Sequence, residues 1–275
     1  MNLAPSLPLQ QHPYFAAALR ALDQPVTARE IGAAACLISL KRFGIRFASR
    51  GPIWQPGTTV SDRADCLRRS GLKLVNADRY DPEAYRHAGF YQINTPGSVA
   101  ELDLRGTTNT IAARTHAKWR NIWRRGQSSL LTFHRTGFAP HKHAWIFEAK
   151  AAQQRQRGYR TLPHDLVAAF ANCRPKDVIV HLALDDDAPV AAMLFLLHHP
   201  VATYHLGWAN AAARRQGAHH QMLMMAANKL QRHGFRRLDL GQVATDAAPS
   251  LARFKIGTGA IVRPLGGTWL KAPGR

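Results

Sequence analysis

The chain has 275 residues, an apolar content of 46% and three widely spaced cysteines, which exclude wholesale disorder and a scaffold held by disulfides. Its 37 Lys and Arg outnumber its 17 Asp and Glu, which gives a formal net charge of +20. This excess predicts affinity for polyanions, whether nucleic acid, phosphorylated ligands or an anionic membrane surface; a bias toward dispersed surface arginines is the alternative.

The N-terminal sequence shows no basic stretch followed by an apolar run, and no segment approaches the ~18 consecutive apolar residues of a membrane span. We therefore expect a protein that is cytoplasmic, or peripheral at the inner face of the membrane. Cys36, Cys66 and Cys173 are expected to be free thiols in a reducing compartment.

The first hundred residues predict a mixed α/β unit that ends near residue 105. Pro13 opens the first helix, and Asp81 is expected to be the N-cap of the third, followed directly by Pro82. The expected helices span 13–22, 62–71 and 81–89, and the expected strands span 33–40, 44–54, 72–77, 90–94 and 98–104.

Residues 110–126, TIAARTHAKWRNIWRRG, predict one long amphipathic helix. One side carries the packing positions Ile111, Thr115, Trp119, Ile122 and Trp123. The adjacent side carries a basic row of Arg114, Lys118 and Arg125. That row is either a contact for nucleic-acid phosphates or a solvated face beside the core. A second helix is expected over 143–158.

The sequence from residue 177 onward predicts a clear order of elements. Short turns at 185–188 and 198–200 join three strands, and Met222, Leu223, Ala226 and Leu230 mark the buried stripe of the following helix. The expected order is strands 177–184, 189–197 and 201–209, helix 219–234, strand 235–241, helix 249–257 and closing strands within 260–270.

Several chemistries find no support in the residues. The histidine pairs at 141/143, 198/199 and 219/220 have neither cysteine nor carboxylate at ligand spacing, so no metal site is expected. The sequence contains no nucleophile elbow, and Gly257-x-Gly259 lacks the third glycine and the following helix of a dinucleotide loop.

The run from strand 201–209 into helix 219–234 offers a site for an anion. Backbone N–H groups at a helix N-terminus attract negative charge, and arginines in the preceding loop add charge-assisted contacts. The expected donor-binding residues of this loop are Arg214, Arg215, Gln216 and Gly217. A solvated connection is the alternative.

The order of elements resembles the GNAT acyltransferase fold. Three stretches are similar to the Fem-type (FemAB-like) aminoacyl-tRNA-dependent transferases, and also to bacterial GNAT-like acyltransferases of uncertain donor: 50–54, 101–126 and 238–260. The resemblance implies an α/β (α+β) fold with two GNAT-like lobes, each a mixed and mostly antiparallel sheet flanked by helices. We expect an acceptor-side lobe over 1–109 and a catalytic, donor-side lobe over 110–275.

The resemblance also implies an enzyme that forms an amide by transferring an acyl or aminoacyl group to an amine. The co-substrate is acyl-CoA or aminoacyl-tRNA, with no permanently bound cofactor, and the acceptor is an amine-bearing small molecule, peptide or peptidoglycan precursor. His219 stands at the last position of the GNAT pyrophosphate pattern, where glycine or alanine is usual. This departure and the basic helix at 111–125 together slightly favour aminoacyl-tRNA over acyl-CoA.

In the Fem-type pattern a Phe-Lys pair lies at the active cleft, and Phe254 and Lys255 match it. The resemblance therefore implies that Lys255 meets a donor phosphate or the developing oxyanion. Tyr204 and His205 are candidates for relaying the amine proton, although a core position suits His205 equally well. The expected acceptor-side residues are Arg50, Trp54 and Asp239. The alternative function is a non-catalytic GNAT-fold module that binds nucleic acid or an anionic surface.

Overall fold

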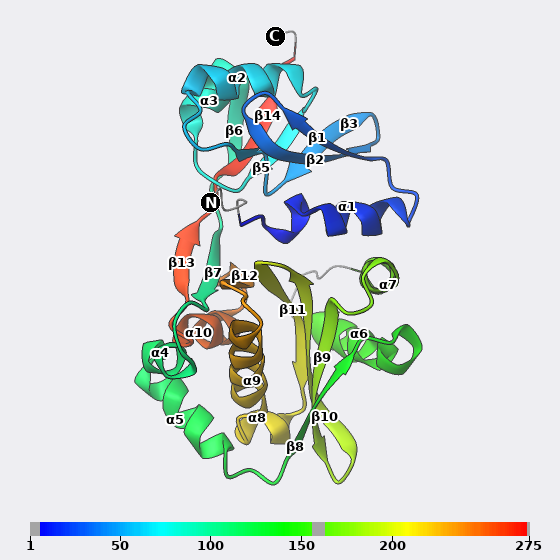
Figure 1. Ribbon diagram of the computed structural model, residues 1–275, viewed down its shortest axis with the longest axis vertical. Coiled ribbons are helices and arrows are strands. Elements are labelled where there is room, and N and C mark those ends of the chain that lie inside the picture. Colours follow the sequence, from blue (N-terminus) through cyan, green and yellow to red (C-terminus); the bar gives the residue numbers. More distant parts are fainter. Residues whose placement is uncertain (1–5, 156–162, 274–275) are drawn as a thin grey trace. The chain divides into compact units, whose positions relative to one another are not determined.

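The computed structural model describes residues 6–155 and 163–273, and the chain divides into two compact units (Figure 1). The first unit contains the chain up to Ser98 and again from Pro264 onward, and the second contains Val99–Arg263. Each unit is built on one mixed sheet with flanking helices, as the fold class expected from the sequence requires.

In the first unit the strands run in the order β1-β2-β3-β5-β14-β6, and β4 pairs with β2. The helices are η1 (Leu9–Gln11), α1 (Pro13–Arg20), α2 (Val60–Arg69) and α3 (Pro82–His87). The strands are β1 (Val26–Ile31), β2 (Ala34–Arg42), β3 (Ile45–Ser49), β4 (Ile53–Trp54), β5 (Leu74–Ala77), β6 (Phe90–Asn94) and β14 (Gly267–Lys271).

The last strand of the chain completes this sheet, because β14 pairs antiparallel with β5 on one side and with β6 on the other. Its Trp269 is fully buried, stacks on Tyr85 with ring centroids 4.9 Å apart, and donates a hydrogen bond from Nε1 to the carbonyl of Gly266. The core of the first unit therefore depends on a strand that follows the whole second unit in the sequence.

In the second unit the strands run in the order β13-β7-β12-β11-β10-β9-β8. The helices are α4 (Thr108–Arg114), α5 (Ala117–Gly126), α6 (Pro140–Arg155), α7 (His164–Cys173), α8 (Ala211–Arg215), α9 (Ala218–Arg232) and α10 (Pro249–Gly257). The strands are β7 (Ser98–Asp103), β8 (Thr132–Gly137), β9 (Val178–Asp185), β10 (Ala188–His198), β11 (Val201–Ala209), β12 (Arg237–Val243) and β13 (Ile261–Pro264).

Helices cover both faces of this second sheet. Figure 1 shows α5 and α9 on one side of strands β9 to β11, and α6 and α7 on the other. The predicted stripe of α9 is confirmed, since all four of its residues are buried in the core. The turn before β10 is confirmed too: Asp186 and Asp187 take positive φ values of 46° and 64°, as a two-residue hairpin loop requires.

The prediction of one continuous helix over residues 110–126 is wrong, because the chain leaves the helical conformation between α4 and α5. Thr115 is extended, with ψ of 142°, and the backbone N–H of His116 donates to the carbonyl of Gly257 at 2.9 Å. A tertiary hydrogen bond thus replaces helical ones. Arg114 ends α4 while Lys118 and Arg125 belong to α5, so the predicted basic row is not continuous.

Other elements differ from the sequence-based expectation. Strands β1 and β8 and helices α7 and α8 were not predicted, and residues 156–158 of the expected second helix lie outside the described part of the chain. Asp81 occupies the N-cap position of α3 but does not cap it, because its carboxylate pairs with the guanidinium of Arg63 at 2.8 Å instead.

The division of the chain also differs from a single boundary between residues 109 and 110. Residues 99–109 lie in the second unit, and residues 264–275 return to the first. The cause is strand pairing, since β7 joins the second sheet and β14 the first. In the part of the chain that the structure describes, no helix is both long and apolar enough to cross a bilayer.

Replacing Trp269 by Ala should destabilise the first unit by about 3–5 kcal/mol, because it removes a fully buried aromatic ring from the stack on Tyr85. Differential scanning calorimetry should show an earlier unfolding transition for Trp269→Ala. Phe43→Ala is the control, since Phe43 is 92% exposed in the same unit and its removal should leave the transition in place. Equal behaviour of the two variants would contradict the central position of β14.

Candidate active site

The most open part of the second sheet lies where β11 and β12 separate. Among the described residues these two strands pair in parallel only over Val201–Thr203 and Arg237–Asp239, although both continue further. We call the region between their unpaired continuations, 204–209 of β11 and 240–243 of β12, the splay. Here the backbone of each strand is available to other groups.

A β-bulge marks the start of the splay on β11. The pairing with β10 passes from Leu206 to Tyr204, which leaves His205 as the additional residue. A bulge bends the strand and redirects the side chains near it. The two residues proposed for proton relay, Tyr204 and His205, therefore sit at the point where the strands begin to separate.

Lys255 approaches the splay from the last turn of α10. It is only 6% exposed, and its Nζ donates to the carbonyl of Gln242 on β12 at 2.8 Å. Burial lowers the pKa of this amine from 10.5 to about 8; the nearby Asp239 carboxylate opposes that change, and the charge of Lys150 adds to it. The group remains mainly an ammonium ion at neutral pH.

Asp239 of β12 is buried, and its carboxylate fixes the backbone that follows it in the strand. Its Oδ1 accepts a hydrogen bond from the N–H of Gly241 at 2.7 Å, and Gly241 has a φ of 75°, which favours glycine. The carboxylate thus holds the turn that carries Gln242 while it acts electrostatically on Lys255.

Lys150 of α6 is a functional candidate that sequence analysis missed. It is 7% exposed, and its Nζ donates to the carbonyl of Gly207 on β11 at 3.1 Å. The hydroxyl of Tyr204 lies against the same glycine, so closely that a Cβ on Gly207 would overlap it. The sequence offered no signal, because Lys150 belongs to no motif and stands in an otherwise ordinary helical stretch.

Phe254 belongs to an aromatic group that joins α10 to α9 and α5. Its ring lies 5.2 Å from His220, 6.0 Å from His219 and 6.2 Å from Trp119, measured between centroids. Burial lowers the pKa of both histidines to about 4, so both are neutral at pH 7. Phe254 therefore packs beside Lys255 and fixes the helix that carries it.

The loop before α9 packs against α5. Gly217 has a φ of 74°, and a Cβ there would lie 3.0 Å from the carbonyl oxygen of Ile122. Likewise, a Cβ on Gly126 would lie 2.9 Å from the carbonyl oxygen of Gln216. The C-terminal half of α5 thus covers part of the helix N-terminus at which a donor phosphate was expected.

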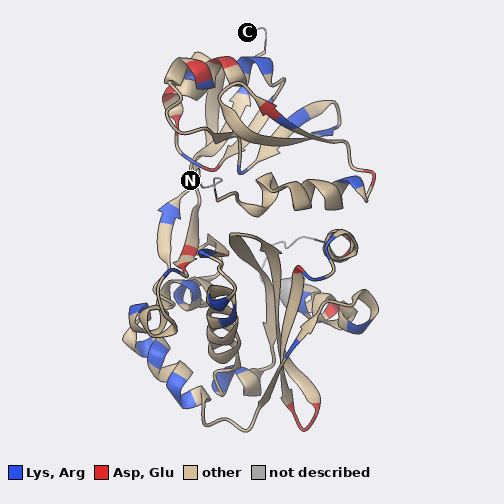
Figure 2. Ribbon diagram, in the orientation of Figure 1, with Lys and Arg blue, Asp and Glu red and all other residues tan. Residues whose placement is uncertain are grey.

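Beside this contact lies an open cavity of about 280 Å³, lined by Arg125, Gly126, Ser128, Ser129, Leu130, Arg215 and Gln216. It brings together Arg125, Arg215 and Gln216, three of the predicted donor-binding residues, beside Gly217. Figure 2 shows lysine and arginine along α5 and on α8, the helices that border the cavity. Two arginines thus line one cavity, and guanidinium groups are well suited to binding phosphate.

The remaining donor-side candidates lie outside the cavity. Lys118 is exposed on α5, and Arg214 donates to the carbonyl of Ala209 at 2.6 Å. Arg114 donates to the carbonyl of Asp103 at 3.1 Å and pairs with the carboxylate of the same residue at 3.6 Å. Arg114 therefore acts within the fold of the second unit and not beside Arg125.

The acceptor-side candidates are divided between the units. Arg50, with a φ of 54°, pairs with Asp78 in the first unit through its Nε at 2.7 Å. Trp54 is half-buried there and packs on the core from β4. Asp239 belongs to the second unit.

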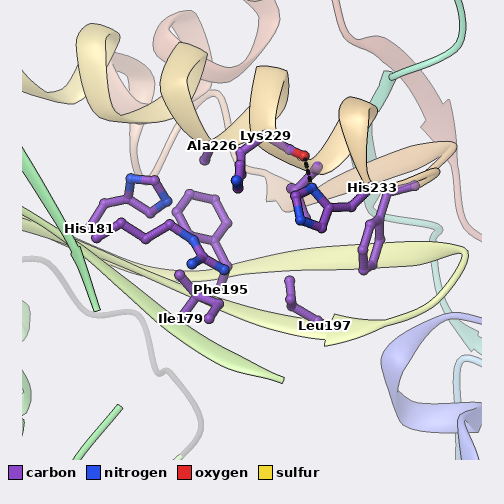
Figure 3. Close-up of a pocket in the computed structure, with 10 residues that line it drawn as sticks. Ile179, His181, Phe195, Leu197, Ala226, Lys229 and His233 are labelled. Carbon is purple, nitrogen blue, oxygen red and sulfur yellow. Dashed lines mark hydrogen bonds between the residues drawn. The ribbon is translucent and has the colours of Figure 1, made fainter. Parts of the chain in front are cut away.

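A second cavity, of about 40 Å³, lies between the C-terminal half of α9 and strands β9 and β10 (Figure 3). Ile179, Phe195 and Leu197 form its apolar wall, and burial lowers the pKa of the adjoining His181 to about 4. Such a volume admits roughly two or three water molecules, so it does not serve as a donor site. Within the described ranges, no group of three or more His, Cys, Asp or Glu is placed to hold a metal ion.

Comparisons with known proteins agree with this geometry. The family profile described as an acetyltransferase (GNAT) domain matches residues 113–255, which is just over half of the chain and includes the splay and Lys255. A search of curated proteins found no match.

Solved structures share the fold at low sequence identity. FemX superimposes with a TM-score of 0.71 at 12% identity, covering 95% of this chain and 93% of its own. The C-terminal domain of a putative lysylphosphatidylglycerol synthetase from Agrobacterium fabrum gives 0.59 at 15%, covering 96% and 89%. A tandem GNAT protein from the clavulanic acid biosynthesis pathway gives 0.51 at 14%, covering 89% and 82%.

Replacing Gly257 by Ala should loosen the packing of α10 on α5, because the new Cβ would lie 2.7 Å from Cδ1 of Trp119. We expect a loss of about 1–3 kcal/mol, measured as a lower midpoint in urea unfolding. Gly137→Ala is the matched control in the same unit, since nothing lies within 4 Å of its Cβ position. A wild-type midpoint for Gly257→Ala would show that Trp119 does not pack as described.

Proposed function

Since this chain belongs to the GNAT acetyltransferase family and is an acyltransferase, we propose that it transfers an aminoacyl group from an aminoacyl-tRNA to an amine, forming an amide. The observation that carries the proposal is the buried ammonium group of Lys255 at the splay of β11 and β12. Family membership favours an enzyme over the non-catalytic binding module.

The proposed reaction needs charge stabilisation more than covalent help. The amine nitrogen adds to the ester carbonyl carbon, the carbonyl oxygen becomes an oxyanion, and the bond to the ribose oxygen then breaks. A fixed, poorly solvated cation beside that oxygen stabilises the transition state more than the substrate. Lys255 supplies this cation, and the hydroxyl of Tyr204, which lies against Gly207 in the splay, is the candidate to pass the amine proton to the leaving ribose oxygen.

The donor is assigned from the surface around the α9 N-terminus. Helix α5 packs on residues 216 and 217, which narrows the approach that a CoA pyrophosphate would use, while Arg125 and Arg215 line the adjoining cavity. The exposed Lys118 extends this positive surface along α5. Cations spread along a surface in this way suit the phosphate backbone of a polynucleotide. The putative lysylphosphatidylglycerol synthetase that shares the fold is named for a product that carries a lysyl group, which supports an aminoacyl group as the one transferred. Acyl-CoA is the alternative donor.

The acceptor is proposed to be an amine-bearing small molecule, a peptide or a peptidoglycan precursor, with the first unit on the acceptor side. There the guanidinium of Arg50 is oriented by Asp78, and Trp54 lies a few residues further along the chain. We propose a cytoplasmic location, or a peripheral one at the inner face of the membrane, where the excess positive charge would meet anionic lipid.

Lys255→Met should lower kcat by roughly 10²–10³-fold, because it removes the cation that stabilises the oxyanion. The assay mixes the protein with charged tRNA or acetyl-CoA and a panel of amines, and detects the amide by mass spectrometry. Lys229→Met, an exposed lysine of the same unit, is the control. Turnover with acetyl-CoA alone would overturn the proposed donor, and full activity of Lys255→Met would overturn the proposed role of Lys255.

The pH dependence follows from the same lysine. Lys255 acts as a cation and its pKa lies at about 8, so wild-type kcat/KM should be level near pH 7 and fall about tenfold per pH unit above about 8. Steady-state kinetics from pH 6 to 10 tests this. The acceptor must be one whose amine is already neutral at pH 7, because deprotonation of the acceptor would itself raise the rate. With such an acceptor, activity that rises through pH 8 would make the neutral Lys255 amine the active form and Lys255 a base.

Arg125→Glu and Arg215→Glu together should weaken tRNA binding at least about tenfold and flatten its salt dependence, because two phosphate contacts are replaced by repulsion. Fluorescence anisotropy with labelled tRNA at several salt concentrations measures both. Arg232→Glu is the control, since this arginine ends α9 about 20 Å from the loop at its start. If Arg232→Glu weakened tRNA binding as much as the double variant does, the binding would be non-specific electrostatic attraction.

A further inference from the structure

The splay is bordered by two buried lysines, each bonded to one of its two strands. Lys150 reaches it from α6 and bonds to the carbonyl of Gly207 on β11, while Lys255 reaches it from α10 and bonds to the carbonyl of Gln242 on β12. Both side chains are more than nine-tenths buried. Their charges influence each other, since Lys150 acts on Lys255 across the opening.

This arrangement is costly for the folded protein. An ammonium ion loses several kcal/mol of hydration when it is buried, and a second cation nearby adds repulsion. Asp239 is a carboxylate that acts on Lys255 and partly offsets this cost. Two buried ammonium groups at one opening are stabilised further when a negative charge arises there, as it does in the transition state of acyl transfer.

Other titratable groups lie around the splay. Burial keeps His219 of α9 neutral at pH 7, with a pKa of about 4, and His220 behaves in the same way. Arg214 is cationic and acts on His219, as Lys150 does. On α10 itself Arg253 is exposed. The splay therefore receives buried cations from two separate helices, α6 and α10.

We propose that Lys150 is a second cationic catalytic residue, which holds the carbonyl oxygen of the acyl donor together with Lys255. As the amine nitrogen bonds to the carbonyl carbon, the electron pair moves to that oxygen and both ammonium groups stabilise it. The pair returns when the bond to the leaving oxygen breaks, and the leaving oxygen takes the proton that the amine gives up. This inference rests on the proposed acyl transfer and holds for either donor.

The test compares Lys150→Met, Lys150→Arg and the matched control Lys142→Met, an exposed lysine on the same helix. Lys150→Met should lower kcat by about 10²-fold, Lys150→Arg should recover most of that loss by restoring the charge, and Lys142→Met should behave as wild type. Circular dichroism establishes that each variant is folded.

Two further readouts separate catalysis from a purely structural role. Without the neighbouring cation, the fall of kcat/KM above about pH 8 should move to higher pH in Lys150→Met and stay in place in Lys150→Arg. The Cε signal of Lys255 in a ¹³C-lysine-labelled sample, assigned by its absence in Lys255→Arg, should titrate at correspondingly higher pH. This measurement requires no turnover.

The outcomes are distinct. An activity loss that Lys150→Arg fails to recover, with an unmoved pH profile and Lys255 titration, would make Lys150 a support for Gly207 and overturn the inference. Turnover with acetyl-CoA instead of charged tRNA would overturn the proposed donor and leave the Lys150 comparison valid. Wild-type protein inactive with both donors would overturn the proposed function and this catalytic role together, while the Lys255 titration would still report whether the two charges interact.

Discussion

The separation of β11 from β12 is the constraint on which the second unit depends. Past Thr203 and Asp239 the two strands stop pairing, yet their backbone carbonyls remain inside the protein and require donors. Two of those carbonyls, on Gly207 and Gln242, receive lysine side chains from α6 and α10. The same two lysines therefore donate hydrogen bonds to the unpaired carbonyls and bring positive charge to the splay. A substitution of either lysine removes both the hydrogen bond and the charge.

Local signals were sufficient to predict much of the second unit. Proline near the start of α10 and glycine at its end gave the bounds of that helix, and the turns at 185–188 and 198–200 gave the antiparallel strands. Long-range contacts were not predictable. The break before α5 arises from a hydrogen bond between His116 and Gly257, which are 141 positions apart. Likewise, β14 joins the first sheet because its pairing partners are β5 and β6.

The same distinction applies to the candidate site. Lys255 was a candidate from the sequence because it follows Phe254 in a recognisable stretch. Lys150 was not, since only its burial against Gly207 in the fold makes it a candidate. Regular spacing suggested that Arg114 and Arg125 share a row. The fold separates them, because Arg114 is drawn to Asp103 while Arg125 faces Arg215 across a cavity that no periodicity reveals.

The position of β14 has a consequence for biosynthesis. The ribosome makes β5 and β6 early, but they cannot be joined until residues 267–271 have been made. The whole second unit, which is continuous over 99–263, is synthesised in between. The strand edges that β14 later covers therefore stay without this partner during that synthesis, and such edges are surfaces that invite wrong pairing or chaperone binding.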